Sequence, residues 1–305
     1  MLIERIQLHT KLSARHLEWY AETASKRYKV YYIPKRNGGM RMIEHPSKEL
    51  KAIQRWICKG MLERLPVHVC ATAYRPGAGI KVNVALHALT NFTLRVDLES
   101  FFPSFTENGV EKFIDLRNQQ LSLALSPQDI KFVSRIVCRN GRLTIGAPTS
   151  PALTNAMMYD FDCAASEWCN SKDLIFSRYA DDIFISSNNP NCLNEALDYI
   201  RAEIDKFSFA NLKLNAGKTV FLSRRYRRTI TGLVISSSRE ISIGRDRKLA
   251  IKDSVYKFKS GLLQPEEIGK IAGMISFIKD VEPRFYDTLS RKYGEEIISK
   301  IQLGR

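Results

Sequence analysis

The sequence lacks any long run of apolar residues. Its first sixteen residues, MLIERIQLHTKLSARH, mix charged and apolar side chains from the fourth position, so they contain no apolar segment of the kind that a secretory signal peptide requires. No other stretch approaches the length that a membrane-spanning helix needs. We therefore expect a cytoplasmic protein that has no membrane partner.

Cysteine is sparse and shows no ligand-like spacing. The six cysteines are scattered, and no C-x-x-C pair occurs among them. A zinc site and a disulfide framework are both disfavoured, and most of these cysteines are expected to be reduced core residues. The chain also contains no internal repeat, low-complexity tract or obvious flexible linker.

Acidic residues are too few to balance the basic ones. The 305 residues include 47 Lys and Arg against 32 Asp and Glu, which gives a net charge of +15. Residues 224–305 alone hold 18 basic and 10 acidic residues, or +8 of that total. An excess of this size is typical of proteins with a polyanionic partner, most commonly nucleic acid. The alternative is a surface charge that serves only solubility.

Hydrophobic periodicity and turn residues predict a chain of alternating helices and strands. Ser47, Ser126 and Asn191 are expected to cap helices. The predicted helices are 13–28, 47–65, 126–138, 152–169, 191–209, 246–260, 265–280 and 283–302. The predicted strands are two around an Asn37-Gly38 turn, 91–98, the hairpin 174–187, one that ends near 223, and short ones at 230–236 and 240–244.

The order of these elements predicts an α+β fold. From residue 91 to 222 it runs strand, helices, hairpin, helix, strand, which is the split β-α-β order of a ferredoxin-like sheet with helices on one face. A basic helical module follows that sheet.

Two adjacent acidic residues, Asp181 and Asp182, interrupt the apolar strands of the hairpin in FSRYADDIFIS. Neighbouring carboxylates repel, and burial raises the cost of ionising them, so a positive partner is expected. Asp97 ends the strand at 91–98, and folding could bring it to the hairpin tip. Three carboxylates suit Mg²⁺, and two such ions can assist phosphoryl transfer. Alternatively, Asp181-Asp182 is only a polar turn.

The chain resembles reverse transcriptases over nearly its whole length, and the matching stretches occur in the family's order. RYADD resembles the Y-x-D-D motif, and VDLESFFPSF is similar to the strand that carries the first catalytic aspartate. YIPKRNGGMRMI resembles the fingers hairpin, KELKAIQRWI the helix after it, GAPTSPALTN the template-and-nucleotide loop, and LKLNAGKT a lysine-bearing turn. The resemblance implies a right-hand polymerase with fingers (1–90), a ferredoxin-like palm (91–225) and a basic helical thumb (226–305).

Two further stretches resemble motifs of bacterial retron reverse transcriptases, which belong to the group II intron-like superfamily. NVALH (83–87) is similar to their N-A-x-x-H motif, and TITGLVI (229–235) to their V-T-G motif. Because the chain ends soon after the basic helices, we expect no RNase H domain. Ile145 stands where many relatives have Gln, which instead resembles the error-prone enzymes of diversity-generating retroelements, so that family stays open as an alternative.

The resemblance assigns roles to individual residues. It implies that Asp97, Asp181 and Asp182 are catalytic and hold two Mg²⁺ ions. It places Phe102 beneath the sugar, where its ring would favour deoxynucleotides. It implies nucleotide binding by Lys35, Arg41, Phe102, Gly146 and Lys218, with Lys218 as a candidate general acid for pyrophosphate. Residues expected to contact RNA are Asn83, His87, Arg224, Arg225, Arg227 and Arg228.

Purely structural interpretations of these residues are open as well. Lys35 and Arg41 could belong to a solvated hairpin, Phe102 could be a core aromatic, and Lys218 could be a surface lysine. Gly146 could serve turn geometry alone, and His87 could be a structural histidine.

The activity that the resemblance implies is RNA-directed DNA synthesis from dNTPs. Retron enzymes of this kind copy a cognate structured non-coding RNA, prime from a guanosine 2′-hydroxyl and leave a branched RNA–DNA hybrid (msDNA). They often act with an effector protein in defence against phage. A polymerase-like fold that only binds structured RNA as a scaffold is the alternative from another class.

Overall fold

Local capping and hairpin pairing organise the N-terminal part of the chain in the computed structural model, which describes residues 2–35 and 38–304. Ser13 caps helix α2 (Ala14–Thr23), which follows α1 (Leu2–Thr10). The prediction of one helix over 13–28 is wrong at its end: a short 3-10 turn (Ala24–Lys26) follows α2, and Tyr28 begins a strand. The chain leaves the helix because the Ser47 N–H donates to the Arg27 carbonyl, which closes a hairpin here.

That hairpin pairs β1 (Tyr28–Pro34) with β2 (Met40–Pro46) in antiparallel register. A turn at Asn37-Gly38 was predicted. Gly38 has a positive φ of +83°, and Asn37 lies outside the described residues. Ser47 caps α3 (Lys48–Gly60), as predicted, through the Leu50 N–H. The helix ends at Gly60, and a 3-10 turn (Leu62–Arg64) completes the expected stretch.

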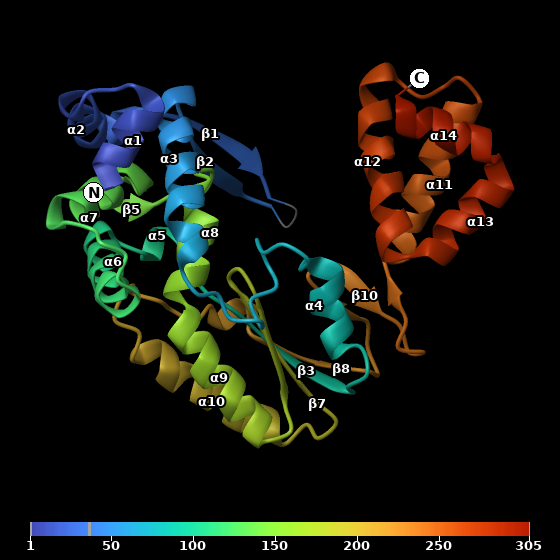
Figure 1. Cartoon of the computed structure of the whole chain (residues 1–305). Helices are drawn as coiled ribbons and strands as arrows, with labels where there is room; N and C mark the ends of the chain where they lie inside the picture. The colour runs from blue at the N-terminus through green and yellow to red at the C-terminus, as the bar shows by residue number, and fades with distance from the viewer. Residues whose placement is uncertain (1, 36–37, 305) are drawn as a thin grey trace. The chain divides into compact units, whose positions relative to one another are not determined.

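A four-stranded sheet has the order β6-β7-β3-β8. Its strands are β3 (Phe92–Asp97), β6 (Ile175–Tyr179), β7 (Asp182–Ser187) and β8 (Val220–Ser223). Helices α9 (Tyr159–Ser171) and α10 (Cys192–Asp205) pack on β6 and β7 (Figure 1). This is the expected ferredoxin-like sheet with helices against it. Asn191 precedes α10 but makes no side-chain cap, and α10 ends before the predicted Phe209.

The remaining elements of this part are helices, two short paired strands and a 3-10 turn. Ser126 and Asp129 form a reciprocal capping box at the start of α7, as the Ser-Pro start predicted. The predicted helix over 152–169 is two helices, because the chain turns at Met158 between α8 and α9. The elements are α5 (Phe101–Ser104), α6 (Glu107–Leu121), α7 (Pro127–Val137), β4 (Cys138–Arg139), β5 (Arg142–Leu143), α8 (Thr149–Met157) and a 3-10 turn (Ala216–Lys218).

The chain divides into two compact units. One comprises Met1–Pro76 and Leu94–Val220, and the other comprises Gly77–Thr93 and Phe221–Arg305. Residues 77–93 therefore belong with the C-terminal residues, although 77–90 lie within the expected fingers and 91–93 at the start of the expected palm. The division into fingers, palm and thumb stays a prediction.

The second unit joins one early helix, α4 (Ile80–His87), to a small sheet and four C-terminal helices. The predicted last helix, 283–302, is broken at Gly294, whose φ is +97°. The strands are β9 (Arg228–Ile230), β10 (Leu233–Ile235) and β11 (Ile241–Ser242). The C-terminal helices are α11 (Arg245–Lys259), α12 (Pro265–Val281), α13 (Pro283–Tyr293) and α14 (Glu295–Leu303).

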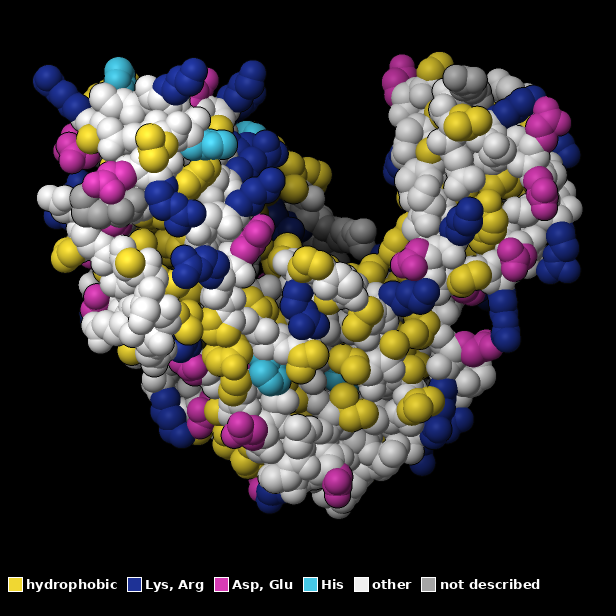
Figure 2. Space-filling view, viewed as in Figure 1, with side chains coloured by type: hydrophobic (Ala, Val, Ile, Leu, Met, Phe, Trp, Pro, Cys, Tyr) yellow, Lys and Arg dark blue, Asp and Glu magenta, His cyan; other side chains and the backbone are white. Residues whose placement is uncertain are grey.

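Basic side chains lie both on the surface and in the interior of the two units. On the face shown in Figure 2, Lys and Arg side chains are spread over the surface with fewer acidic ones between them. Two arginines, Arg178 and Arg228, are the largest of the fully buried side chains. Such burial is unusual for a charged residue and calls for specific partners. Within the described ranges, no helix combines the length and apolar character needed to cross a bilayer.

Candidate active site

The three predicted carboxylates come together at one end of the sheet. Asp97 is the last residue of β3, Asp181 lies in the hairpin turn, and Asp182 begins β7. A hydrogen bond of 3.0 Å from the Leu98 N–H to the Asp181 carbonyl joins the strand end to the turn. The hairpin register, in which Tyr179 pairs with Asp182, leaves Ala180 and Asp181 as the two turn residues.

Negative charge is concentrated at this point. Burial, then Asp182, then Asp97 raise the pKa of Asp181 to about 6. Burial also raises the pKa of Asp182, although the Arg95 guanidinium opposes the shift. Two cationic side chains offset part of the charge. Arg95 donates to Asp182 from Nε at 3.0 Å and from Nη2 at 2.8 Å, and the Lys218 ammonium forms an ion pair with Asp97.

The chemistry of this cluster fits a divalent cation. Carboxylate oxygens are the ligands that Mg²⁺ prefers, and a cation beside Asp181 would favour its ionised form against the burial and the neighbouring carboxylates that raise its pKa. The arrangement itself is looser than a formed metal site. Within residues 2–35 and 38–304, no three acidic, His or Cys side chains are grouped so that they could hold one ion. Lys218 and Arg95 each contact one of the three carboxylates instead.

The rings of Phe102 and Tyr74 lie near the carboxylates, whereas the neighbouring ring of Phe101 belongs to the core. Phe101 is the core residue of its pair, with 4% of its surface exposed, and it packs against Phe105 at 5.2 Å between ring centroids. Phe102 is only half-buried, and its ring lies 6.4 Å from that of Tyr74. Burial and then the Asp181 charge raise the pKa of the Tyr74 phenol, which places that phenol beside the acidic cluster.

The β1–β2 hairpin carries the predicted triphosphate-binding cations. Arg41 is exposed on β2, and its charge acts on the Tyr74 phenol, so it lies toward the cluster. Lys35 is exposed at the hairpin end, where its N–H donates to the Gly39 carbonyl.

Gly146 docks the hairpin. A Cβ at Gly146 would lie 2.8 Å from the Glu44 carbonyl oxygen, and its φ is +124°. The Glu44 N–H donates to the adjacent Ile145 carbonyl at 2.8 Å. Glycine is therefore needed here for the approach of β2, whatever the loop does with a nucleotide.

The residues predicted to contact RNA fall into two groups within the second unit. Arg224, Arg225 and Arg227 are exposed. Asn83, His87 and Arg228 are buried, so their side chains are not available for direct contact in this structure. Arg228 is 1% exposed and instead holds the end of α4, because its guanidinium donates to the His87 and Ala88 carbonyls at 3.5 and 3.3 Å. The retron-like motif at 229–235 also contacts the start of α4, since the Thr231 hydroxyl donates to the Ile80 carbonyl at 3.4 Å.

Two contributors to the site were not among the predicted residues. Arg95 lies two residues before Asp97 on the same strand, and the two-residue period of a strand places it on the same face. That period was the available signal. Arg178, in the RYADD stretch itself, has partners far away in sequence that no local pattern reveals.

The fold and the acidic cluster together define a nucleic acid polymerase of the right-hand type. A sequence model of the family "Reverse transcriptase (RNA-dependent DNA polymerase)" matches residues 33–243. The chain belongs to this family, and within it to the retron reverse transcriptases. It is 34% identical to the retron Ec83 reverse transcriptase of Escherichia coli, over 90% of this chain and 89% of that one. It is 31% identical to the retron Ec86 enzyme of the same species, over 95% and 90%.

Solved structures agree on the fold. Telomerase from Candida tropicalis aligns with a TM-score of 0.52 at 11% identity in its complex with an RNA fragment, covering 97% of this chain and 64% of the telomerase. The same enzyme without RNA gives 0.51 at 13% identity, with 95% and 63% covered. This chain thus spans less than two thirds of the telomerase length. At these identities the likeness concerns the fold alone.

Proposed function

We propose that this enzyme copies a cognate structured non-coding RNA into DNA with dNTPs and leaves a branched RNA–DNA hybrid, msDNA. We also propose that it works with a retron effector protein in defence against phage. The observation that carries the catalytic part is the convergence of Asp97, Asp181 and Asp182 at one strand end. Support for the retron part comes from the two retron relatives, each aligned over about nine tenths of both chains.

Asp97, Asp181 and Asp182 would hold two Mg²⁺ ions. When bound, such ions stabilise the charge that develops on the attacking and leaving oxygens of a phosphoryl transfer. The protein contributes position and fixed charge. Arg95 keeps Asp182 oriented through two hydrogen bonds to one carboxylate oxygen, and Lys218 supplies positive charge beside Asp97.

The groups around the carboxylates would bind the incoming nucleotide. Arg41 and Lys35 would contact its triphosphate, and Lys218 would donate a proton to the departing pyrophosphate. The half-buried ring of Phe102 would lie against the sugar and disfavour a 2′-hydroxyl. Gly146 would contribute by keeping the hairpin docked on its loop, because a side chain there would displace Glu44.

Exposed arginines of the second unit would bind the RNA backbone. Arg224, Arg225 and Arg227 are available for sequence-independent phosphate contacts. Asn83, His87 and Arg228 would act indirectly, by fixing α4 and the β9–β10 strands that present neighbouring surfaces.

Asp181→Asn tests the catalytic assignment. It should abolish RNA-templated dNTP incorporation while RNA affinity stays within about twofold, because it changes a charge but neither the fold nor the basic surface. Asp173→Asn is the matched control, since Asp173 is an exposed turn residue with φ of +54°, and it should retain full activity. RNA-dependent synthesis by Asp181→Asn would show that the site assignment is wrong. RNA binding without any synthesis by the unmodified enzyme would favour the scaffold alternative.

The retron part needs a cellular measurement. Small DNA from cells that express the gene with its native flanking region is run on a denaturing gel with and without RNase. We expect a discrete short DNA that RNase shifts and that Asp181→Asn eliminates. If no such DNA forms while the purified enzyme still extends a supplied primer on RNA, the polymerase stands and another lineage, such as the diversity-generating enzymes, is favoured.

A further inference from the structure

An arginine is buried directly beneath the hairpin turn that carries the catalytic carboxylates. Arg178 lies on β6, three residues before Asp181, and none of its surface is exposed. A buried guanidinium is costly unless its hydrogen bonds are satisfied, and an apolar residue could fill the same space. The contacts of Arg178 therefore bear on why a charge stands at this position.

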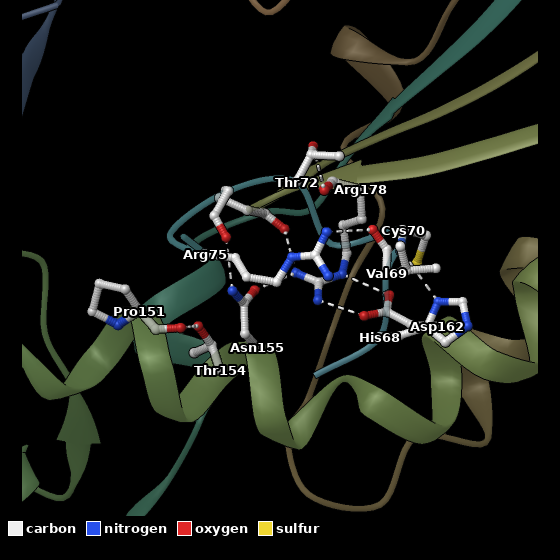
Figure 3. Close-up of polar contacts among 12 residues, drawn as sticks. His68, Val69, Cys70, Thr72, Arg75, Pro151, Thr154, Asn155, Asp162 and Arg178 are labelled. Carbon is white, nitrogen blue, oxygen red and sulfur yellow. Dashed lines mark hydrogen bonds and ion pairs between the residues drawn. The ribbon is translucent and has the colours of Figure 1, made fainter. Parts of the chain in front are cut away.

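Four hydrogen bonds occupy the guanidinium (Figure 3). Its Nε and Nη2 donate to the two carboxylate oxygens of Asp162 on α9, at 2.7 and 2.6 Å, and Asp162 is also fully buried. Burial by itself lowers the pKa of Arg178, but the Asp162 charge reverses this and the pKa is raised. Arg178 is thus held in its charged form by Asp162, which lies on helix α9.

The remaining arm of the guanidinium reaches the catalytic turn. Nη1 donates to the Ala180 carbonyl at 3.1 Å. Ala180 has φ of +56°, a conformation that is strained for a residue with a side chain and that persists only where neighbouring structure enforces it. The next residue after Ala180 is Asp181, so the contact sets the path of the backbone into the catalytic carboxylates.

The same nitrogen also links the turn to a second segment. Nη1 donates to the Asn155 side-chain oxygen at 3.2 Å, and the Asn155 side-chain nitrogen donates to the Ala73 carbonyl at 2.8 Å. The residue after Ala73 is Tyr74, which is also strained, with φ of +57°. The backbone of Arg178 supports this segment further, because the Thr72 N–H donates to its carbonyl at 2.8 Å.

A second arginine–aspartate pair on α9 offers a comparison, because its arginine bonds elsewhere. A single nitrogen of Arg117, Nη2, donates to both carboxylate oxygens of Asp160, which is also on α9, at 2.8 Å each. The Arg117 side chain is 7% exposed, and besides Asp160 its hydrogen bonds among the described residues go to Gln120 and not to the catalytic turn. Both pairs join an arginine to an aspartate of α9, but the Asp160 side chain is 59% exposed whereas that of Asp162 is fully buried, and only Arg178 also bonds to the catalytic turn.

We propose that Arg178, fixed by Asp162 and Asn155, is a positioning residue that holds the Ala180–Asp181 turn and the Ala73–Tyr74 segment in register around the active site. The proposal rests on the catalytic role proposed for Asp181 and Asp182. It assigns a function to the arginine of RYADD and to the asparagine of the GAPTSPALTN stretch.

Steady-state primer extension on an RNA template tests it with two variants. Arg178→Lys keeps a positive charge but loses the forked contacts. The double variant Arg178→Met with Asp162→Leu removes the whole pair, which leaves no unpaired buried charge and is the form most able to fold. For both we expect kcat to fall about 100-fold, because small displacements of catalytic groups have effects of that size. KM for dNTP and the affinity for RNA should stay within about threefold.

The controls separate positioning from stability and from the site assignment. Arg117→Met should keep kcat within about twofold even if it lowers the unfolding midpoint as much as the Arg178 variants do. Amide hydrogen exchange should accelerate at residues 179–182 in the Arg178 variants and not in Arg117→Met. A double variant that melts like the unmodified enzyme and retains its kcat would overturn the proposal. A loss confined to RNA affinity would overturn it too, whereas activity of Asp181→Asn would instead overturn the site on which it rests.

Discussion

Acid should destabilise the second unit through one histidine. His87 lies at the end of α4 and is fully buried. Burial, and then the charge of Arg228, lower the pKa of His87 from 6.5 to about 3. Above pH 6.5 the ring is neutral in both the folded and the unfolded chain, so it confers no pH dependence there. Below pH 6.5 the unfolded chain binds a proton that the folded chain does not, so the free energy of unfolding falls as the pH falls.

The size of the effect follows from the two pKa values. Between about pH 6.5 and pH 3, one such group removes about 1.4 kcal/mol of stability per pH unit. Acidification from about pH 8 to about pH 5 should therefore cost about 2 kcal/mol. That is a large share of the roughly 5–15 kcal/mol that stabilises a typical domain.

Urea unfolding of the unmodified chain and of His87→Gln, followed by circular dichroism at the two pH values, isolates this term. All other groups titrate in both proteins, so the difference between their stabilities reports on His87. We expect that difference to move by about 2 kcal/mol in favour of the variant on acidification. His16→Gln, at an exposed position of α2, should move with the unmodified chain. A difference that changes by less than about 0.5 kcal/mol would refute the reasoning.

Two further predictions concern the first unit. Gly146→Ala should lower the free energy of unfolding by about 1–3 kcal/mol, because its Cβ would meet the Glu44 carbonyl at positive φ. Gly141→Ala, also at positive φ but facing open space, should cost less in the same urea titration, and equal losses would contradict the docking argument. Phe102→Ala should raise ribonucleotide over deoxynucleotide incorporation at least about tenfold in primer extension. Phe101→Ala should instead cost about 3–5 kcal/mol of stability, and unchanged sugar selection in Phe102→Ala would contradict the role of its ring.

Helix starts were predictable where the side chain of one residue satisfies the backbone of its neighbours. Ser47 and Ser126 cap α3 and α7 as expected, because a hydroxyl followed by helix-forming residues is a local signal. Asn191 is also of a residue type that favours N-cap positions, but it makes no cap bond, since its backbone is already helical with φ of −68° and ψ of −28°. Helix ends were less predictable. The chain leaves α2 before Tyr28 because the Arg27 carbonyl accepts a hydrogen bond from the Ser47 N–H, which is distant in sequence.

The candidate site divides in the same way. The adjacent carboxylates Asp181 and Asp182 stand out because burial and mutual repulsion make them expensive between two apolar strands, so the hairpin sequence alone points to them. Their partner Asp97 follows from the strand order of the sheet. The cationic partners do not follow from the strand order. Arg95 can be inferred only from the two-residue period of β3, and the Lys218–Asp97 ion pair joins residues 121 positions apart.

The sequence by itself determined the family, the order of the elements and the acidic turn, because motifs, periodicity and caps depend on residues a few positions apart. Only the tertiary structure decided what the arginines do. Arg228 and Arg225 belong to one basic run, yet Arg228 is buried against the end of α4 while Arg225 is exposed. Arg178 is buried because Asp162 and Asn155 converge on it from two helices. Burial and long-range pairing arise from packing between distant segments, and no local pattern carries that information.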